Sequence, residues 1–315
     1  MFPIFFSRKH KQNYSRVSNG WEAGGEVMPV VDDIPRFVKT GSYASLFGDQ
    51  WKRYTKTQLD SYTGVPISKQ RLERCLGNLR DNLQNKVMLE AGCGAGRFTE
   101  ILLEKGTNLV SADLTSAVEA NKENCPVTDR HLIIQADIND MPFSDGSFEI
   151  VLCIGVIQHT PNPDQTIENL YNLVKPGGTL IIDHYTYGKS YMFRLAPFYR
   201  RFLRKMPPEK TIPYTQRLVN RYLPWHKRFA NSKILSVLLN RISPVASYYR
   251  TIPDLNDQQQ VEWSLLDTHD SLTDYFKHFR SKPELVSLMK RLGAINIWCE
   301  YGGNGVELRC NKPLQ

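Results

Sequence analysis

Three acidic residues and three glycines in one short stretch of the chain could together bind a nucleoside. Each acid lies at or near the end of an apolar run: Glu90, Asp113 and Asp137. Glycines follow the first acid at alternate positions: Gly92, Gly94 and Gly96. Glycine has no Cβ, so a ligand can closely approach a backbone that carries several of them. No GKS/T sequence follows to bind a phosphate chain, so these residue types favour a ligand with a ribose and a positive charge.

The spacing around the glycines separates two kinds of nucleoside site. A dinucleotide fold wants the pattern GxGxxG, and counted from Gly92 its last glycine would fall where the sequence has Arg97. Asp113 follows Gly92 by 21 residues, about where an acid reaches a ribose hydroxyl in such folds. A nicotinamide-dependent oxidoreductase is therefore disfavoured, whereas a ribose contact by Asp113 is expected.

The elements that must position these residues alternate between strands and helices. We expect strands at 87–91, 108–112, 131–135, 148–154 and 179–183, and helices at 96–105, 116–123, 164–174 and 282–292. The run "INIWCEY-GGNG-VELRC" predicts an antiparallel hairpin near the end of the chain. Strands separated by helices imply an α/β, doubly wound parallel sheet, whose carboxyl strand ends line one crevice. The three acids can therefore meet at one edge of the sheet.

The motifs from Met88 to Ile182 resemble those of the class I S-adenosylmethionine-dependent methyltransferases. "LEAGCGAGRFT" resembles the first motif of that family, "ADL" its ribose-binding acid, and "LVKPGGTLII" the turn before its fifth strand. "ADINDMPFSDGSFEIVLCIGVIQHTPNP" resembles its adenine and post-strand-four motifs. The resemblance implies a Rossmann-like, seven-stranded sheet with an antiparallel last strand, and S-adenosyl-L-methionine as the cofactor. The lead-in from Ile34 to Asp60 resembles that of a bacterial subgroup that often modifies saccharides, lipids or secondary metabolites.

The resemblance also implies a role for each motif residue. Glu90 would orient the glycine loop, which would pass under the methionine and ribose, and Asp113 would accept from both ribose hydroxyls. Asp137 would accept from adenine N6 with Ile138 beside the ring, and residues 154–159 would wall the methyl-transfer side. The expected cofactor-binding set is Glu90, Gly92, Gly94, Gly96, Asp113, Leu114, Asp137, Ile138 and Ile154.

The expected chemistry is methyl transfer, in which the protein mainly aligns an acceptor with the methyl group and excludes water. A hydroxyl acceptor also needs a base to take its proton. His159 is the candidate catalytic residue, with Asp183 and His184 as alternatives at the end of the fifth strand. A carbon or amine acceptor needs no protein base, and His159 in "QHTPNP" would then be a solvated loop residue.

Structural interpretations of the same residues stay open. The glycines could form only a tight strand–helix turn, and Asp113 and Asp137 could be helix N-caps. The sequence "DTHD" at 267–270 looks like a metal or acid/base cluster, but a helix-capping loop is the favoured interpretation. The six cysteines are scattered without a CxxC pair, so no metal site is predicted and a reducing compartment is favoured.

Net charge divides the chain unevenly. The protein carries +8 in total, but residues 184–250 hold 14 Lys/Arg and one acid, which gives +13 there and −5 elsewhere. We expect an irregular then helical lead-in at 1–80, a cofactor-binding core at 81–184, a basic helical lid at 185–275, and a closing helix and hairpin at 276–315. For the basic segment three interpretations stay open: a lid alone, contact with an anionic membrane surface through residues 190–206, or nucleic-acid binding.

These observations predict a methyltransferase whose acceptor is a small molecule, a saccharide or a lipid-linked compound, with O-methylation favoured. The alternatives are an RNA or protein methyltransferase, or a non-catalytic module that binds the same cofactor. Nucleic acid is disfavoured because "IGVIQHTPNP" departs from the Asn/Asp-Pro-Pro-aromatic motif of amino-purine methylating enzymes. The N-terminal apolar patch is too short for an anchor and precedes its charges, so a cytoplasmic protein is expected, with the inner membrane face as a site of peripheral contact.

Overall fold

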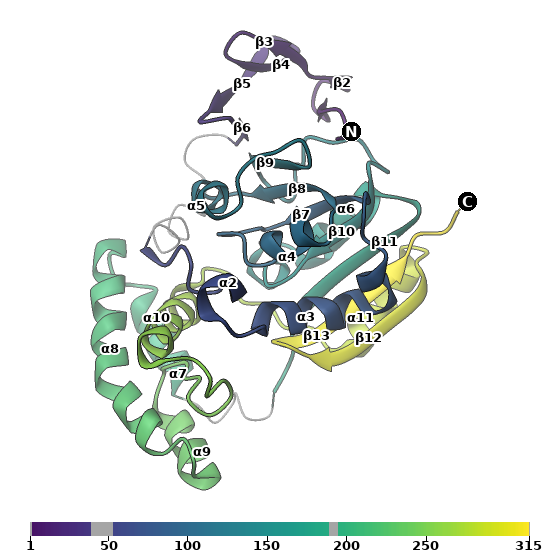
Figure 1. Ribbon diagram of the computed structural model, residues 1–315. Helices are drawn as coiled ribbons and strands as arrows, with labels where there is room; N and C mark the ends of the chain where they lie inside the picture. The colour runs from purple at the N-terminus through teal and green to yellow at the C-terminus, as the bar shows by residue number, and fades with distance from the viewer. Residues whose placement is uncertain (1, 39–52, 189–194, 315) are drawn as a thin grey trace. The chain divides into compact units, whose positions relative to one another are not determined.

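The computed structural model describes residues 2–38, 53–188 and 195–314. The chain divides into two compact units. Unit 1 comprises Met1–Thr55, Ile67–Thr186 and His278–Gln315, and unit 2 comprises Lys56–Pro66 and Tyr187–Lys277. Figure 1 labels their helices and strands.

Unit 1 is built on a mixed sheet with the strand order β12-β13-β11-β10-β7-β8-β9-β6-β5-β4-β3. The parallel centre consists of β7 (Val87–Ala91), β8 (Asn108–Asp113), β9 (His131–Ala136), β10 (Phe148–Cys153) and β11 (Val174–Tyr185). The hairpin of β12 (Ile295–Gly302) and β13 (Gly305–Asn311) adds β13 antiparallel to β11. The α/β doubly wound class with an antiparallel last strand is confirmed, although the sheet has more strands than the seven expected.

Helices cover both faces of the central strands because successive side chains of each strand point to opposite faces. On one face, α3 (Ile67–Leu76) and α4 (Thr99–Glu104) pack over a core that includes Met88 and Leu109. On the other face, α6 (Pro163–Leu173) and α11 (Lys282–Arg291) pack over Leu89 and Val110. The remaining helix of this core, α5 (Ala117–Asn124), joins β8 to β9. Parallel strands that are buried on both faces consist of continuous apolar runs, and for this reason their positions could be predicted from the sequence.

An irregular N-terminal segment was expected, but residues 6–37 form short strands. These are β1 (Phe6–Ser7), β2 (Gln12–Asn13), β3 (Ser15–Val17), β4 (Gly20–Ala23), β5 (Glu26–Val31) and β6 (Ile34–Phe37). The strands β3 to β5 form an antiparallel meander, and β6 pairs in parallel with β9. Runs this short carry little periodic signal, and the prolines within β5 and β6, Pro29 and Pro35, are residues that more often occur outside strands. The helical part of the lead-in is α2 (Asp60–Thr63), α3 and a 3-10 turn, η1 (Gly77–Asp81).

Unit 2 is helical in its described residues. It contains α2 together with α7 (Ala196–Leu203), α8 (Pro208–Arg228), α9 (Lys233–Ile242) and α10 (Asp257–Thr273). The "DTHD" sequence lies within α10 and is not a capping loop. Its Asp267 accepts from the Trp263 indole of the same helix at 3.1 Å. Its His269 ring contacts the Thr211 hydroxyl of α8 at 3.2 Å, so His269 joins two helices of this unit.

The segment expected to contact a membrane, residues 190–206, begins outside the described residues. Its described part forms α7 and the turn that follows. Within the described parts of the chain, no helix is both long and apolar enough to cross a bilayer.

Candidate functional site at the carboxyl edge of the sheet

The order in which the chain adds strands to the sheet reverses between β7 and β10, which are neighbours at its centre. From β7 the chain proceeds to β8 and β9 on one side, whereas β10 is followed by β11 on the other. At such a switch point the loops leaving the two strands diverge and open a crevice beyond their carboxyl ends. The loop after β7 is the glycine loop, and the loop after β10 holds Ile154 to His159.

The glycine loop turns back over the end of β8. The backbone N–H groups of Gly92 and Cys93 donate to the Ala112 carbonyl oxygen at 2.7 and 3.0 Å. Gly92 has a φ of 82°, and a Cβ on it would lie 2.2 Å from Cγ2 of Val156 in the loop after β10. The interpretation of Gly92 as part of a tight strand–helix turn is therefore supported, because the absent side chain makes room for the neighbouring loop.

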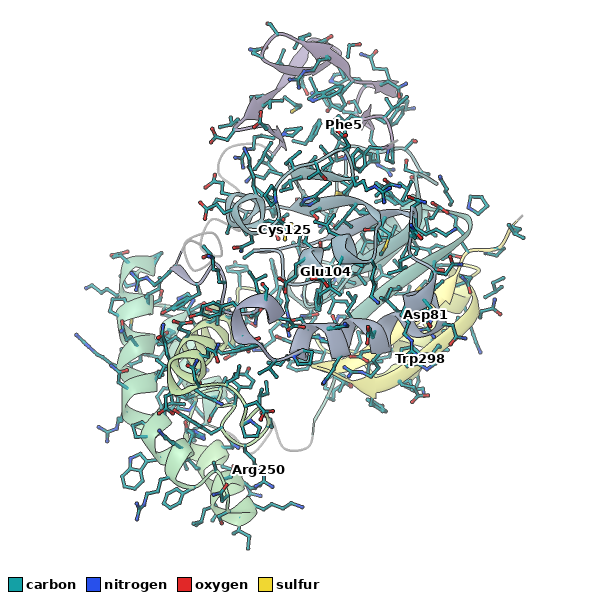
Figure 2. The ribbon with its side chains drawn as sticks, viewed as in Figure 1. Phe5, Asp81, Glu104, Cys125, Arg250 and Trp298 are labelled. Atoms are coloured by element: carbon teal, nitrogen blue, oxygen red, sulfur yellow. The ribbon has the colours of Figure 1, made fainter. Side chains whose placement is uncertain are left out.

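The other end of the glycine loop packs against α5. A Cβ on Gly96 would lie 3.2 Å from the sulfur of Cys125, which follows α5 and is labelled in Figure 2. Gly94 and Gly96 also have positive φ angles, of 51° and 102°, which side chains rarely adopt. The positive φ angles of the three glycines thus shape the loop itself.

Glu90 is a buried carboxylate without a charged partner among its hydrogen bonds. Its Oε2 accepts from the hydroxyls of Thr99 at 2.6 Å and Ser111 at 3.2 Å. Its Oε1 is buried and has no hydrogen-bond partner in the described structure. Burial raises the pKa of Glu90 to about 7 against the hydrogen bonds of the two hydroxyls, and the nearby Asp113 adds to the rise. An acid in this setting exchanges its proton near neutral pH.

Asp113 ends β8 and reaches back to the glycine loop. Its Oδ2 accepts from the Gly94 backbone N–H at 3.0 Å. Its Oδ1 accepts from the backbone N–H and hydroxyl of Thr115 at 2.9 and 2.7 Å. Burial raises the pKa of this carboxyl against those hydrogen bonds. A fourth hydrogen bond, from the Leu114 backbone N–H, also acts to lower the pKa of this carboxyl, so a ribose contact by Asp113 stays a prediction.

The residues after β9 form a tight turn. Asp137 Oδ1 accepts from the backbone N–H of Asn139 at 2.8 Å and from its side-chain amide at 3.3 Å. Ile138 is buried, as is Ile154 directly after β10. Leu114 follows Asp113, and its carbonyl oxygen accepts from the Gln135 amide at 2.9 Å. Asp137 therefore shapes its own loop, and a contact with adenine stays a prediction.

His159 ends the short 3-10 helix η2 (Ile157–His159) in the loop after β10. Its partly exposed ring packs edge-on against Tyr185 at the end of β11, with ring centroids 5.3 Å apart. The Tyr185 ring lies 6.2 Å from that of Phe279. Aromatic walls of this kind can hold an imidazole in one orientation beside an acceptor. Catalysis by His159 stays a prediction.

The two alternative bases have other surroundings. The Asp183 carboxylate is almost fully buried and pairs with the Arg71 guanidinium of α3. Its second oxygen accepts from the Gly155 backbone N–H at 2.6 Å, so it holds the loop after β10 in place. His184 is fully buried and donates through Nδ1 to the Tyr185 carbonyl oxygen 2.9 Å away, and burial lowers its pKa.

Arg71 is a site residue that the sequence did not indicate. It and Arg74 lie one turn apart on α3, and Arg74 pairs with the buried Glu307 of β13. Asp183 and Glu307 face one another on adjacent strands. A polar residue on the apolar side of a helix was the available signal, but nothing local in the sequence pairs residues 112 positions apart.

Comparisons with known proteins bear on the same part of the chain. Residues 89–182 match the family model described as a methyltransferase domain. A ubiquinone biosynthesis O-methyltransferase of Pseudomonas fluorescens (strain Pf0-1) is 22% identical over 190 residues, which cover 58% of this chain and 80% of that protein. The enzyme of the same name from Pseudomonas aeruginosa (strain UCBPP-PA14) is 23% identical with the same coverage.

Solved structures give only a low likeness. Human N-acetylserotonin methyltransferase in complex with SAM has a TM-score of 0.47 at 13% identity, covering 87% of this chain and 61% of that one. Magnesium protoporphyrin IX methyltransferase from Synechocystis PCC 6803 with bound SAH has a TM-score of 0.46 at 12% identity, covering 86% and 96%. At these scores neither structure carries an argument about this site.

The family match and the strand order agree on the same segment. The matched residues run from β7 to β11 and contain the glycine loop, both acids next to it and the loop after β10. The resemblance found in the sequence is thereby confirmed. The core of unit 1 is a class I S-adenosylmethionine-dependent methyltransferase domain.

Proposed function

We propose that this protein transfers a methyl group from S-adenosylmethionine to a hydroxyl of a small-molecule, saccharide or lipid-linked acceptor. The observation that carries the proposal is the pair of acids at the glycine loop, Glu90 and Asp113, beside the loop that holds His159. The family match supports methyl transfer, and relatives named as O-methyltransferases favour a small-molecule hydroxyl.

The acids at the loop fit this cofactor. Asp113 is partly exposed beside the glycine loop, where a ribose can approach it, and the buried Oε1 of Glu90, which has no partner in the described structure, leaves an acceptor for a hydrogen bond from the cofactor's amino end, directly or through water. When bound, S-adenosylmethionine supplies a methyl group made electrophilic by its sulfonium. The chain's own part is to hold the acceptor in line, to exclude water and to remove a proton.

His159 is the base we propose for a hydroxyl acceptor. Its ring is partly exposed in the loop after β10, whereas Asp183 is committed to Arg71 and Gly155, and His184 is fully buried. The edge-on contact with Tyr185 fixes the ring plane. A base that is both accessible and oriented can meet the acceptor hydroxyl at hydrogen-bond distance.

Unit 2 is proposed as the lid that sets acceptor choice, because the chain enters and leaves it next to the site loops. Before unit 2 begins at Lys56, the Thr55 carbonyl oxygen accepts from Asn124, whose amide also donates to Ala95 in the glycine loop, both at 2.8 Å. Just after the chain returns at Ile67, the Ser68 hydroxyl accepts from Arg97 at 2.9 Å.

The second passage lies beside the loop after β10. The chain leaves unit 1 after Thr186, directly past Tyr185, and returns at His278. There the His278 N–H donates to the Gln158 carbonyl oxygen at 3.0 Å, and the Arg280 N–H donates to that of Tyr185 at 2.8 Å. A movement of either site loop would therefore displace a connection between unit 1 and unit 2, as is expected where the connection acts as a hinge.

Calorimetry with S-adenosylmethionine and its demethylated product tests the cofactor assignment. We expect Asp113→Asn to weaken binding by about 10- to 100-fold, because a charge-assisted hydrogen bond becomes a neutral one. Asp129→Asn, at an exposed acid outside the site, is the matched control and should leave affinity unchanged. Binding that Asp113→Asn leaves intact contradicts the ribose contact, and stabilisation by NAD in place of S-adenosylmethionine contradicts the cofactor.

Labelled cofactor and fractionated extract identify the acceptor. We expect label in a small-molecule or lipid fraction, and turnover that His159→Gln lowers by about 10²–10⁴-fold with cofactor affinity unchanged. Label in RNA or protein would move the acceptor to those classes. Tight cofactor binding without any labelled product would indicate a binding module.

A further inference from the structure

Helix α9 turns its apolar side chains outward. Its buried residues are Ser236 and Leu239. Its exposed aliphatic residues are Ile234, Leu235, Val237, Leu238 and Ile242. Four of these, at positions 234, 237, 238 and 242, follow the spacing of one helical face, and Ile234 is 73% exposed. A helix normally buries such a face, so this one lacks an apolar partner among the described residues of unit 2.

Helix α7 carries a second apolar stripe that begins where α9 ends. Leu195, Phe198 and Phe202 are exposed at helical spacing, with Phe198 71% exposed. The Leu195 backbone N–H donates to the Arg241 carbonyl oxygen at 2.8 Å, which places the start of this stripe beside the last turn of α9. The start of one stripe therefore lies beside the end of the other, although the two are separated in the sequence.

Cations accompany both stripes. The exposed basic residues among the described residues 195–250 are Arg201, Arg204, Lys205, Lys210, Arg217, Arg221, Lys227, Arg228, Lys233, Arg241 and Arg250. Glu209 is the one acid among residues 184–250 of the sequence. In Figure 2, long side chains extend from α8 and α9. Trp225 of α8 is 54% exposed as well.

We propose that α7 and α9 dock on an anionic lipid bilayer, with their apolar stripes in the headgroup region and their cations at the lipid phosphates. Helices that bind at this depth combine an apolar face with Lys and Arg, as these two do. Each cation near such a surface contributes about 1 kcal/mol of binding. The inference concerns α7 and α9 alone and does not rest on methyl transfer.

Charge decides between this occupant and two others. A second copy of the chain would bring another +13 segment against the first, and like charges of that size repel. Nucleic acid would satisfy the cations but would leave the aliphatic face of α9 exposed, because phosphates and riboses are polar. An anionic bilayer satisfies both the cations and the apolar stripes.

Vesicle sedimentation tests the proposal with the full-length protein. One set of vesicles contains phosphatidylglycerol in phosphatidylcholine, and the other contains phosphatidylcholine alone. We expect the protein to sediment with the anionic vesicles, to stay in solution with the neutral ones, and to dissociate as salt shortens the Debye length to well below about 8 Å.

Two double variants separate the apolar and the electrostatic contributions. Ile234→Ser with Leu238→Ser should weaken vesicle binding by about tenfold, since each loses buried apolar surface. Arg201→Glu with Lys205→Glu should weaken it by about 25-fold or more, since two cations are lost and two anions gained. The matched controls lie in unit 1: Val27→Ser with Val31→Ser at exposed valines, and Lys290→Glu with Arg291→Glu at exposed cations.

Each other outcome overturns the proposal. Equal binding to neutral and anionic vesicles, or no binding to either, removes the anionic bilayer. If the unit 1 control Lys290→Glu with Arg291→Glu also loses vesicle binding, the binding depends on the net charge of the protein rather than on α7 and α9. Sedimentation velocity without lipid would reveal a dimer, and a dimer that Ile234→Ser with Leu238→Ser dissociates would assign the apolar face to a second copy.

Discussion

Glu90 and Asp183 are both nearly fully buried acids of the central sheet, but their surroundings differ in kind. Asp183 has a guanidinium from α3 on one oxygen and the Gly155 N–H on the other. Glu90 has only hydroxyls on one oxygen, and no hydrogen-bond partner on the other in the described structure. A buried charge is costly unless it is paired. The Asp183 site is therefore complete within the chain, whereas the Glu90 site is incomplete.

This difference distinguishes a residue that stabilises the fold around the crevice from a residue that is available to a ligand. Asp183 joins α3, β11 and the loop after β10, so its contribution is to the fold. Glu90 lies at the start of the glycine loop. Burying its carboxylate with one oxygen unsatisfied costs free energy in the ligand-free protein, and a bound ligand that donates to that oxygen would reduce this cost. Variants at the two sites should therefore change stability in opposite directions.

The largest effect is expected from Arg71→Met. It leaves the Asp183 carboxylate buried without its cation, and breaking such a pair costs about 3–5 kcal/mol. Urea unfolding followed by circular dichroism measures this loss, and adding Asp183→Asn should recover part of it. Arg80→Met, at an exposed pair with Asp81, should change the free energy of unfolding by less than about 1 kcal/mol. Equal losses in both variants would mean that the Asp183 pair is no more important than a surface pair.

The next effect is a gain in stability from Glu90→Gln. Because burial raises the pKa of Glu90 to about 7 in the folded state, the folded protein holds this proton more tightly than the unfolded chain. The free energy of unfolding should therefore fall by about 3 kcal/mol as pH rises from the ordinary pKa of Glu to about 7. Glu90→Gln removes that dependence, so the variant should be more stable than the wild type at pH 8 and similar to it at pH 4.

Glu149→Gln is a control of opposite sign. Burial acts to raise the pKa of Glu149, but hydrogen bonds from the Val87 N–H and from Lys86 outweigh it, so the pKa lies below its ordinary value. The wild-type residue stabilises the protein at neutral pH, and its amide variant should be less stable there. If Glu90→Gln were also destabilising at pH 8, the raised pKa of Glu90 would be refuted.

The smallest effect in this series is the pH dependence of the stability lost in Thr99→Val. The variant removes the hydroxyl that donates to Glu90 at 2.6 Å and accepts from Asn121 at 2.9 Å. A hydrogen bond to a charged group contributes about 1.5–3 kcal/mol and a neutral one about 1 kcal/mol. The cost should therefore be greater at pH 8 than at pH 5. Thr107→Val, whose buried hydroxyl donates to the Leu102 carbonyl oxygen, should cost about the same at both pH values.

The parts of the fold that were predictable have strong local signals. Buried parallel strands appear as apolar runs, and Gly92, Gly94 and Gly96 mark a turn whose φ angles are positive in the structure. The N-terminal strands were missed because two to six residues carry too little pattern to be told from a loop. The "DTHD" residues were misplaced because their polar side chains face partners inside unit 2 rather than water.

The candidate site was only partly predictable for a related reason. The positions of Glu90 and Asp113 follow from spacing along the chain, and the structure brings both to the glycine loop. Spacing does not reveal that Val156 occupies the space beside Gly92, or that Arg71 pairs with Asp183, because these contacts join segments far apart in the sequence. The contacts of Asp137 and His159 with ligand stay predictions.

The place of β13 in the sheet has a consequence for how the protein is made. β13 is the last strand in the sequence, yet it lies between β11 and β12. On the ribosome, β11 and β12 are synthesised first and have no direct pairing with each other, so the edge of β11 stays bare until residues 305–311 emerge. Unpaired strand edges are where nascent chains associate wrongly. Premature termination within the final hairpin should therefore yield aggregation-prone chains, even though every residue of the cofactor loops has already been synthesised.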